Sequence, residues 1–140
     1  MFDDVDVGSL KNAINSCKNS INYKTTQRLI SDVSSSSVWD ASCKSNLQNS
    51  MQELITRNTD IEKKLDSYLG VASLIGEYQK LEKEEKELEA DCDYYRRMID
   101  RTEDEDTIDY YSSKLSQALK RIKVIKNKKT VILNQIKSSI

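Results

Sequence analysis

Apolar residues recur in alternating steps of three and four along most of this chain, and this spacing constrains its fold more than any other feature. Such spacing gathers apolar side chains on one face of an α-helix and is typical of a coiled-coil seam. Residues that make turns are scarce, since there is no proline and the glycines are Gly8, Gly70 and Gly76. We therefore predict an all-α fold of elongated antiparallel helical hairpins, or coiled coil, with a long central helix.

The spacing divides the chain into three predicted helices. Residues 9–33 form one broad apolar face, and Ser9 is the expected N-cap of this first helix. A second helix is expected over residues 40–100. The third follows a run of acidic residues and is expected to begin with Thr107 as its N-cap.

The seam positions are the residues that we expect to bury most of the apolar surface. In the second helix the seam changes phase between Gly70 and Gly76, whereas in the third it keeps one phase throughout. The seam comprises Leu47, Met51, Leu54, Ile61, Leu65, Tyr68 and Leu88 in the second helix, and Leu115, Ile122, Ile125, Ile132 and Ile136 in the third.

Two corners between these helices set the expected domain organisation. Residues 1–8 are predicted to be a flexible N-terminus, residues 9–76 a first helical hairpin, and residues 77–140 a second, continuous antiparallel hairpin. The stretch 77–93 holds eight acidic residues against three lysines, whereas the chain from Tyr110 onward holds eight Lys or Arg and no acidic residue. Exposed ion pairs contribute only ~0–1 kcal/mol each, so this complementarity is expected to select antiparallel pairing rather than to supply stability.

The composition argues against enzymatic chemistry. The chain contains no histidine, which removes the usual general base, the commonest zinc ligand and the Cys-His or Ser-His pairs of nucleophilic catalysis. Cys17, Cys43 and Cys92 are an odd, widely spaced set at apolar helical positions, and we predict buried thiols rather than disulfides. Because the sequence also lacks a Gly-rich loop or metal-ligand spacing, we expect no enzyme activity, catalytic residue, cofactor or metal.

The start of the chain and its hydropathy indicate where it acts. Residues 1–9 are acidic and lack the basic and apolar regions of a signal peptide. No apolar run approaches the roughly 20 residues that span a membrane, so no membrane insertion is expected. We expect a cytoplasmic protein, and any export would use a route without a cleaved signal peptide.

The corner formed by Trp39, Asp40 and Ala41 lies between two predicted amphipathic helices. A large aromatic side chain at a bend can pack across both helices, and a small residue two positions later lets the chain turn tightly. The arrangement resembles the helical hairpin of the WXG proteins that type VII (ESX) secretion systems export, with Ala41 in place of their glycine. The resemblance covers about residues 9–80 and implies that this corner contributes to partner binding.

The resemblance also implies what such a partner is. Tyr78 and Glu82 fit the Tyr-x-x-x-Asp/Glu export signal of that family, and Phe2 to Asp6 is similar to an aromatic-acid motif among helical partners of LXG toxins. The hairpin after residue 80 resembles longer accessory proteins that pair with LXG effectors. The implied function is a non-enzymatic targeting partner or chaperone that binds a WXG-like protein or the N-terminal helical domain of an LXG effector, and that is exported with it.

Two other interpretations follow from the residues alone. In the first, the chain is a coiled-coil scaffold or adaptor subunit unrelated to secretion, for example a homodimer. In the second, the lysine-rich third helix binds nucleic acid, but the adjacent acidic stretch would compete for those lysines, and no aromatic residue follows Tyr111 to stack on a base. We therefore expect a helical protein partner or a homodimer, and no nucleic acid.

Overall fold

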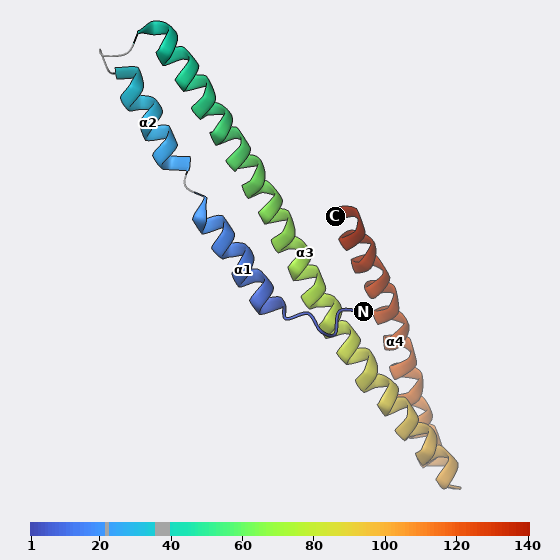
Figure 1. Ribbon diagram of the computed structural model, residues 1–140. Helices are drawn as coiled ribbons and strands as arrows, with labels where there is room; N and C mark the ends of the chain where they lie inside the picture. Colours follow the sequence, from blue (N-terminus) through green and yellow to red (C-terminus); the bar gives the residue numbers. More distant parts are fainter. Residues whose placement is uncertain (22, 36–39) are drawn as a thin grey trace. The chain divides into compact units, whose positions relative to one another are not determined.

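The chain is mainly helical over the residues that the structure describes, which are 1–21, 23–35 and 40–140 in this computed structural model. Figure 1 shows the helices in chain order. Within the described ranges there is no strand, so the predicted all-α fold with a long central helix is confirmed. The elements are α1 (Val7–Ser20), α2 (Tyr23–Ser35), α3 (Ala41–Arg101) and α4 (Glu105–Ser139).

The chain divides into two compact units, and the boundary between them falls within α3. Asp6–Ala72 form what we call the N-terminal unit. Ser73–Ile140, together with Met1–Val5, form the C-terminal unit. The first five residues therefore belong to the same unit as α4.

In the N-terminal unit, α1 and α2 lie antiparallel to the first part of α3 (Figure 1). The Lys18 ammonium group on α1 pairs with the Asp66 carboxylate on α3. The Gln48 amide on α3 donates a hydrogen bond to the Ser34 hydroxyl on α2. Ser34, which follows Lys18 in the sequence, contacts Gln48, which precedes Asp66. The two contacts therefore define one antiparallel register.

The prediction of one helix over residues 9–33 is wrong, because two helices occupy this stretch. The first ends at Ser20, and Ile21 is extended, with φ −77° and ψ 110°. The Ser20 hydroxyl donates a 2.7 Å hydrogen bond to the Cys17 carbonyl. Serine side chains can compete in this way with the hydrogen bonds of the backbone at a helix end. The apolar spacing continues across the break, so it gives no sign that the helix ends there.

The N-caps of two helices lie three residues before the N-caps that the sequence predicts. At α1, Asp6 Oδ1 accepts a 3.0 Å hydrogen bond from the Ser9 N–H, and Oδ2 accepts one from the Ser9 hydroxyl. At α4, Asp104 Oδ2 accepts from the Thr107 N–H at 3.1 Å. A carboxylate gains additional stabilisation from the positive end of the helix dipole. The bonds from Ser9, that of its backbone N–H above all, lower the pKa of Asp6.

In the C-terminal unit, α4 returns antiparallel along α3 after a corner at residues 102–104. Tyr78, Glu85 and Cys92 are buried on α3 at a spacing of seven residues, which places them on one face. Ile125 on α4 has no exposed surface. The core near the corner consists of Cys92, Ala118 and Ile122, with Leu88, Tyr95 and Leu115 packed against it.

Candidate partner-binding surfaces

The corner that carries the family resemblance is only partly described. Trp39 lies outside the described residues. Asp40 acts as the N-cap of α3, since its Oδ1 accepts a 2.7 Å hydrogen bond from the Cys43 N–H and its carbonyl accepts from the Lys44 N–H at 3.0 Å. Ala41 is the first residue of α3 and is exposed.

Three seam residues of the N-terminal unit form an exposed apolar row, which we call the α3 ridge. Leu54, Ile61 and Tyr68 are 51%, 49% and 47% exposed. Their spacing of seven residues places them along one face of α3. The ridge is therefore a large apolar feature that the N-terminal unit leaves open to solvent.

The intramolecular contact of the N-terminal unit uses a neighbouring face of α3. Ile55 is only 7% exposed, although it directly follows the half-exposed Leu54. Successive helical residues point about 100° apart, so α1 and α2 cover one flank of the predicted seam and leave the other open. The remaining seam positions of this unit, Leu47, Met51 and Leu65, are half-buried between the two flanks.

Charged residues of alternating sign border the α3 ridge on the side away from Ile55. They are Glu53, Arg57, Asp60 and Lys64, and all four are exposed. Flanking charges of this kind choose the partner and the orientation of a helix that docks on an apolar seam. The ridge and its border thus have the two components of a helix-docking surface.

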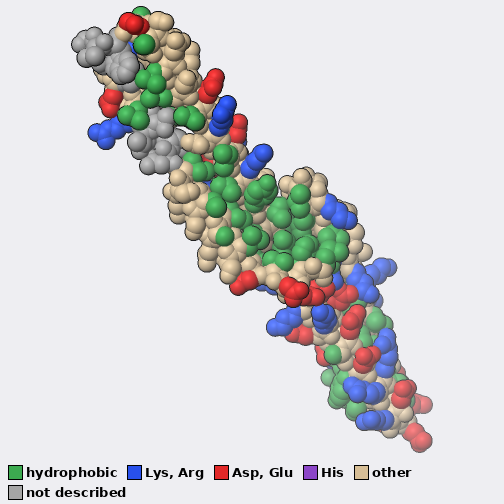
Figure 2. Space-filling view, in the orientation of Figure 1, with side chains coloured by type: hydrophobic (Ala, Val, Ile, Leu, Met, Phe, Trp, Pro, Cys, Tyr) green, Lys and Arg blue, Asp and Glu red, His purple; other side chains and the backbone are tan. Residues whose placement is uncertain are grey.

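The C-terminal unit buries its own seam more completely. Leu88 and Leu115 are half-buried, and the four isoleucines of the predicted α4 seam are 0–8% exposed. Figure 2 shows acidic and basic side chains interspersed over this hairpin toward its corner. Arg121 Nε donates a 2.7 Å hydrogen bond to Glu84 Oε1 across the helices. This bond lowers the pKa of Glu84 and raises that of Arg121.

Lys129 is the centre of a half-buried charge cluster between α3 and α4. Its Nζ donates to Glu85 Oε2 at 2.8 Å and lies 3.9 Å from Glu82 Oε1. Lys126 approaches the second oxygen of Glu85 at 3.8 Å. Burial by itself would lower the pKa of Lys129, but the hydrogen bond to Glu85, the charges of both glutamates and the nearby Tyr78 raise it overall.

The two residues of the predicted export signal take part in this cluster. Tyr78 is 8% exposed, and the Lys129 ammonium group lies 5.0 Å from the centroid of its ring. The Phe2 ring meets the Tyr78 ring edge-on, at 5.3 Å between centroids. Glu82 is half-buried beside Lys129. Sequence reasoning did not anticipate the contact of Phe2 with Tyr78; its one signal was a lone phenylalanine in an acidic segment.

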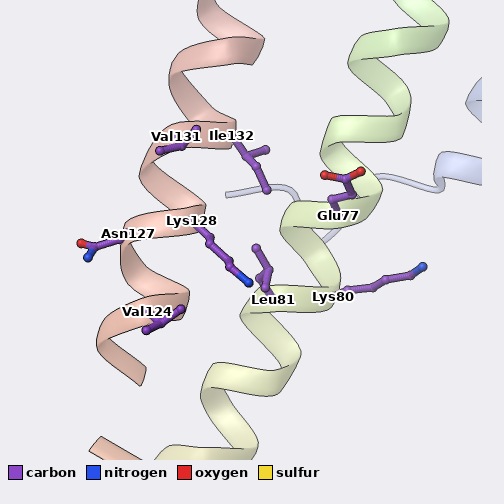
Figure 3. Close-up of a pocket in the computed structure, with 8 residues that line it drawn as sticks. All are labelled: Glu77, Lys80, Leu81, Val124, Asn127, Lys128, Val131 and Ile132. Carbon is purple, nitrogen blue, oxygen red and sulfur yellow. The ribbon is translucent and has the colours of Figure 1, made fainter. Parts of the chain in front are cut away.

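A groove of about 630 Å³ runs between α3 and α4 in the C-terminal unit, as Figure 3 shows. Its apolar wall includes Leu81 and Ile132, together with Val124 and Val131, which are 44% and 56% exposed. Polar groups at its border are Glu77, Lys80, Asn127 and Lys128. Hydrophobic side chains also gather over the C-terminal half of α4 in Figure 2.

The prediction of three buried cysteines is wrong for two of them. Cys17 and Cys43 are exposed, whereas Cys92 is 2% exposed. Burial raises the pKa of the Cys92 thiol. Periodicity misplaced the other two because each lies near a helix end, Cys17 close to Ser20 and Cys43 on the first turn of α3, where the neighbouring helix covers less surface.

Comparisons with known proteins leave the family open: no family model, no curated protein and no solved structure matches this chain. Within the described residues, no group of three or more Cys, Asp or Glu is arranged to hold a metal ion. In the same part of the chain, no helix combines the length and the apolar character that crossing a membrane requires.

Proposed function

We propose that this protein is a non-enzymatic helical interaction protein and that an amphipathic helix of a partner docks lengthwise on the α3 ridge. The observation that carries the proposal is the half-exposed row of Leu54, Ile61 and Tyr68, aligned on one face of α3. Apolar patches of this kind on a protein surface mark interaction sites. Helix docking on an apolar face uses anchors at helical spacing, which the ridge provides.

The specific form of the proposal is an accessory partner of a type VII secretion effector. Its support is the resemblance of the Trp39 corner and of the first two helical segments to WXG proteins, together with the open ridge beside them. In this form the partner helix belongs to the N-terminal helical domain of an LXG effector, and the complex is the exported species. Tyr78 and Glu82 are held in intramolecular contacts in the chain alone, so a role in export would require their presentation from the complex.

The second candidate function is a homodimeric scaffold, and the border of the ridge favours it. In two antiparallel copies of α3 related by a two-fold axis, Glu53 can face Lys64 of the other copy while Arg57 faces Asp60. Every charge then meets its opposite, and Leu54 lies near Ile61 of the second copy. Self-complementary surfaces of this kind are what a two-fold interface requires.

Co-expression separates the two functions. The tagged chain is co-expressed with the N-terminal helical domain of an LXG effector and purified, and the mass of the product is measured by light scattering. A one-to-one complex supports the accessory function, whereas a homodimer that excludes the effector domain supports the scaffold.

Ile61→Asp is the decisive variant, because it places a charge in the centre of the ridge. It should weaken either complex at least roughly thirtyfold, as loss of an interface hot spot does. Leu119→Asp is the matched control, since Leu119 is also partly exposed but lies on α4, outside the ridge and outside the groove. If the Ile61→Asp variant binds the effector domain or itself as tightly as the wild type does, the ridge is not a docking surface. The same conclusion follows if the wild-type chain stays monomeric with every partner that is co-expressed.

A further inference from the structure

Residues 2–5 form a compact turn that lies against α3 in the C-terminal unit. The Val5 N–H donates a 3.1 Å hydrogen bond to the Phe2 carbonyl, which closes a four-residue β-turn over Asp3 and Asp4. Both aspartates are exposed, whereas Phe2 and Val5 are half-buried. We call residues 1–5 the N-terminal strap.

A single glutamine side chain holds both ends of this turn. Gln79 Nε2 donates to the Phe2 carbonyl at 2.7 Å and to the Val5 carbonyl at 2.8 Å. A primary amide has two N–H donors, and here each one is directed at a backbone carbonyl of the same turn. The contact therefore recognises the shape of a peptide turn rather than its side chains.

Next to Gln79, an aromatic contact recognises the first side chain of the turn. The Phe2 and Tyr78 rings are perpendicular, with an interplanar angle of 89°, which is a favoured geometry for aromatic pairs. The Tyr78 ring is itself held in place by Lys129, which the two glutamates of the charge cluster fix from α3. The site is thus built on the rigid interface between α3 and α4 and does not depend on the strap for its position.

The surroundings of the turn favour an acidic peptide. Asp3 borders a shallow pocket of about 240 Å³ whose other lining residues are Gln79, Glu82, Lys83 and Lys86. Glu82 in the same lining is held by Lys129, and Lys83 pairs with Glu87, so Lys86 is the lysine that places positive charge next to Asp3. An acidic side chain at position two of a bound turn is therefore favoured electrostatically by Lys86, in a manner that salt screens.

We propose that Tyr78, Gln79 and Lys86 form a binding site for a short acidic peptide turn that begins with an aromatic residue, and that the N-terminal strap occupies this site as a displaceable internal ligand. A partner segment of the same chemistry, aromatic-acidic-acidic-aliphatic, competes with the strap for it. The strap is held by few contacts, two hydrogen bonds from one side chain and one ring pair, so a partner segment can replace it. The site belongs to the C-terminal unit and its occupancy does not depend on the α3 ridge.

Binding of a synthetic peptide to the full chain tests the site. The probe is a fluorescein-labelled peptide with the sequence of residues 1–8, and binding is followed by fluorescence anisotropy. Phe2→Ala in the protein removes the internal aromatic residue and should open the site. Because the internal ligand is covalently attached to the protein, it competes with the peptide at a fixed effective concentration, and the Phe2→Ala protein should bind the peptide roughly tenfold or more tightly than the wild type.

Variants on the side of the site show whether the peptide binds where the strap does. In the Phe2→Ala background, Gln79→Ala removes both hydrogen bonds and should weaken binding roughly tenfold or more. Gln117→Ala, at an exposed glutamine of α4, is the matched control and should leave it unchanged. Circular dichroism of each variant verifies that the helices are retained.

Two further arms complete the test. A peptide in which phenylalanine is replaced by alanine should fail to bind, and Lys86→Glu should weaken binding and reduce its dependence on salt. Equal binding by the wild-type and Phe2→Ala proteins would overturn the internal competition. Absence of binding by the folded Phe2→Ala protein, or binding that ignores Gln79→Ala, would overturn the site itself. Neither result bears on effector or self-association through the ridge.

Discussion

Replacing Lys129 by methionine tests whether the charge cluster between α3 and α4 stabilises the C-terminal unit. Methionine keeps much of the length and the apolar stem of lysine but removes its charge and its donors. The Lys129 and Glu85 side chains are 16% and 11% exposed and lie 2.8 Å apart. The substitution therefore leaves a nearly buried carboxylate without its principal partner.

This geometry sets limits on the expected loss in the free energy of unfolding of the C-terminal unit. Breaking a fully buried ion pair by removing one partner costs about 3–5 kcal/mol. The cost here is smaller, because Lys126 remains 3.8 Å from Glu85 and can move closer. We expect the free energy of unfolding of the C-terminal unit to fall by about 2 kcal/mol near neutral pH, which lies between the cost for a fully buried pair and that for an exposed pair.

The pH dependence follows from the direction of the Lys129 pKa shift. Although burial alone would lower this pKa, Glu85 and its neighbours raise it above the ordinary lysine value. Because the folded-state pKa is raised, charged Lys129 contributes its full share of the free energy of unfolding at any pH below the unfolded-state pKa. This contribution is lost as the pH rises through the folded-state pKa. The difference between wild type and Lys129→Met should therefore stay constant through neutral pH and shrink above about pH 10.4.

Amide hydrogen exchange in α4 is the measurement, because it reports the opening free energy of one unit of a two-unit chain. The buried Ile125 is a suitable reporter. Lys126→Met is the matched control: Lys126 contacts the same glutamate but is 62% exposed, so it should cost no more than about 0.5 kcal/mol. The reasoning from burial is refuted if the amides of α4 exchange as slowly in Lys129→Met as in the wild type. It is also refuted if Lys129→Met and Lys126→Met lower the opening free energy equally.

Three further predictions concern single residues. Ile125→Ala should destabilise the C-terminal unit by about 2–4 kcal/mol because it empties a fully buried site, whereas Val124→Ala, at a 44% exposed position, should cost less than about 1 kcal/mol in the same exchange experiment. Asp40→Ala should cost about 1 kcal/mol by removing the N-cap of α3, with faster exchange of the Cys43 amide as the readout. A thiol reagent should modify the exposed Cys17 and Cys43 rapidly and the buried Cys92 slowly in the folded protein. Equal modification rates for all three thiols would contradict the burial of Cys92.

The sequence predicted the second hairpin better than the first, and the reason lies in how each seam is composed. On α4 the predicted seam keeps one phase throughout, and its four isoleucines, Ile122, Ile125, Ile132 and Ile136, are all buried, although Val124 and Val131 next to them are exposed. On the first half of α3, Leu54 and Ile55 are adjacent and both apolar. The sequence of α3 alone does not determine which of them α1 and α2 cover, because that depends on the neighbouring helices.

Features that depend on the backbone or on distant contacts were also beyond the reach of periodicity. The end of α1 depends on the Ser20 hydroxyl, and the start of α4 on the Asp104 carboxylate, both of which act on backbone groups. The sequence predicted a flexible N-terminus over residues 1–8 and did not place the N-terminal strap against α3. Its position depends on Gln79, 77 residues away from Phe2 along the chain, and no local pattern encodes such a contact.

The short corner between α3 and α4 also has a kinetic consequence. Contacts between these helices span more of the chain as they lie further from the corner: 37 residues for Arg121 with Glu84 and 44 for Lys129 with Glu85. Closing a longer loop costs more entropy, so the contacts between α3 and α4 should form first near the corner and then progressively further from it. The hairpin should fold at the rates that are typical of proteins with low contact order. The strap, which closes a loop of 77 residues, should be the last part of the C-terminal unit to assemble and the first to detach.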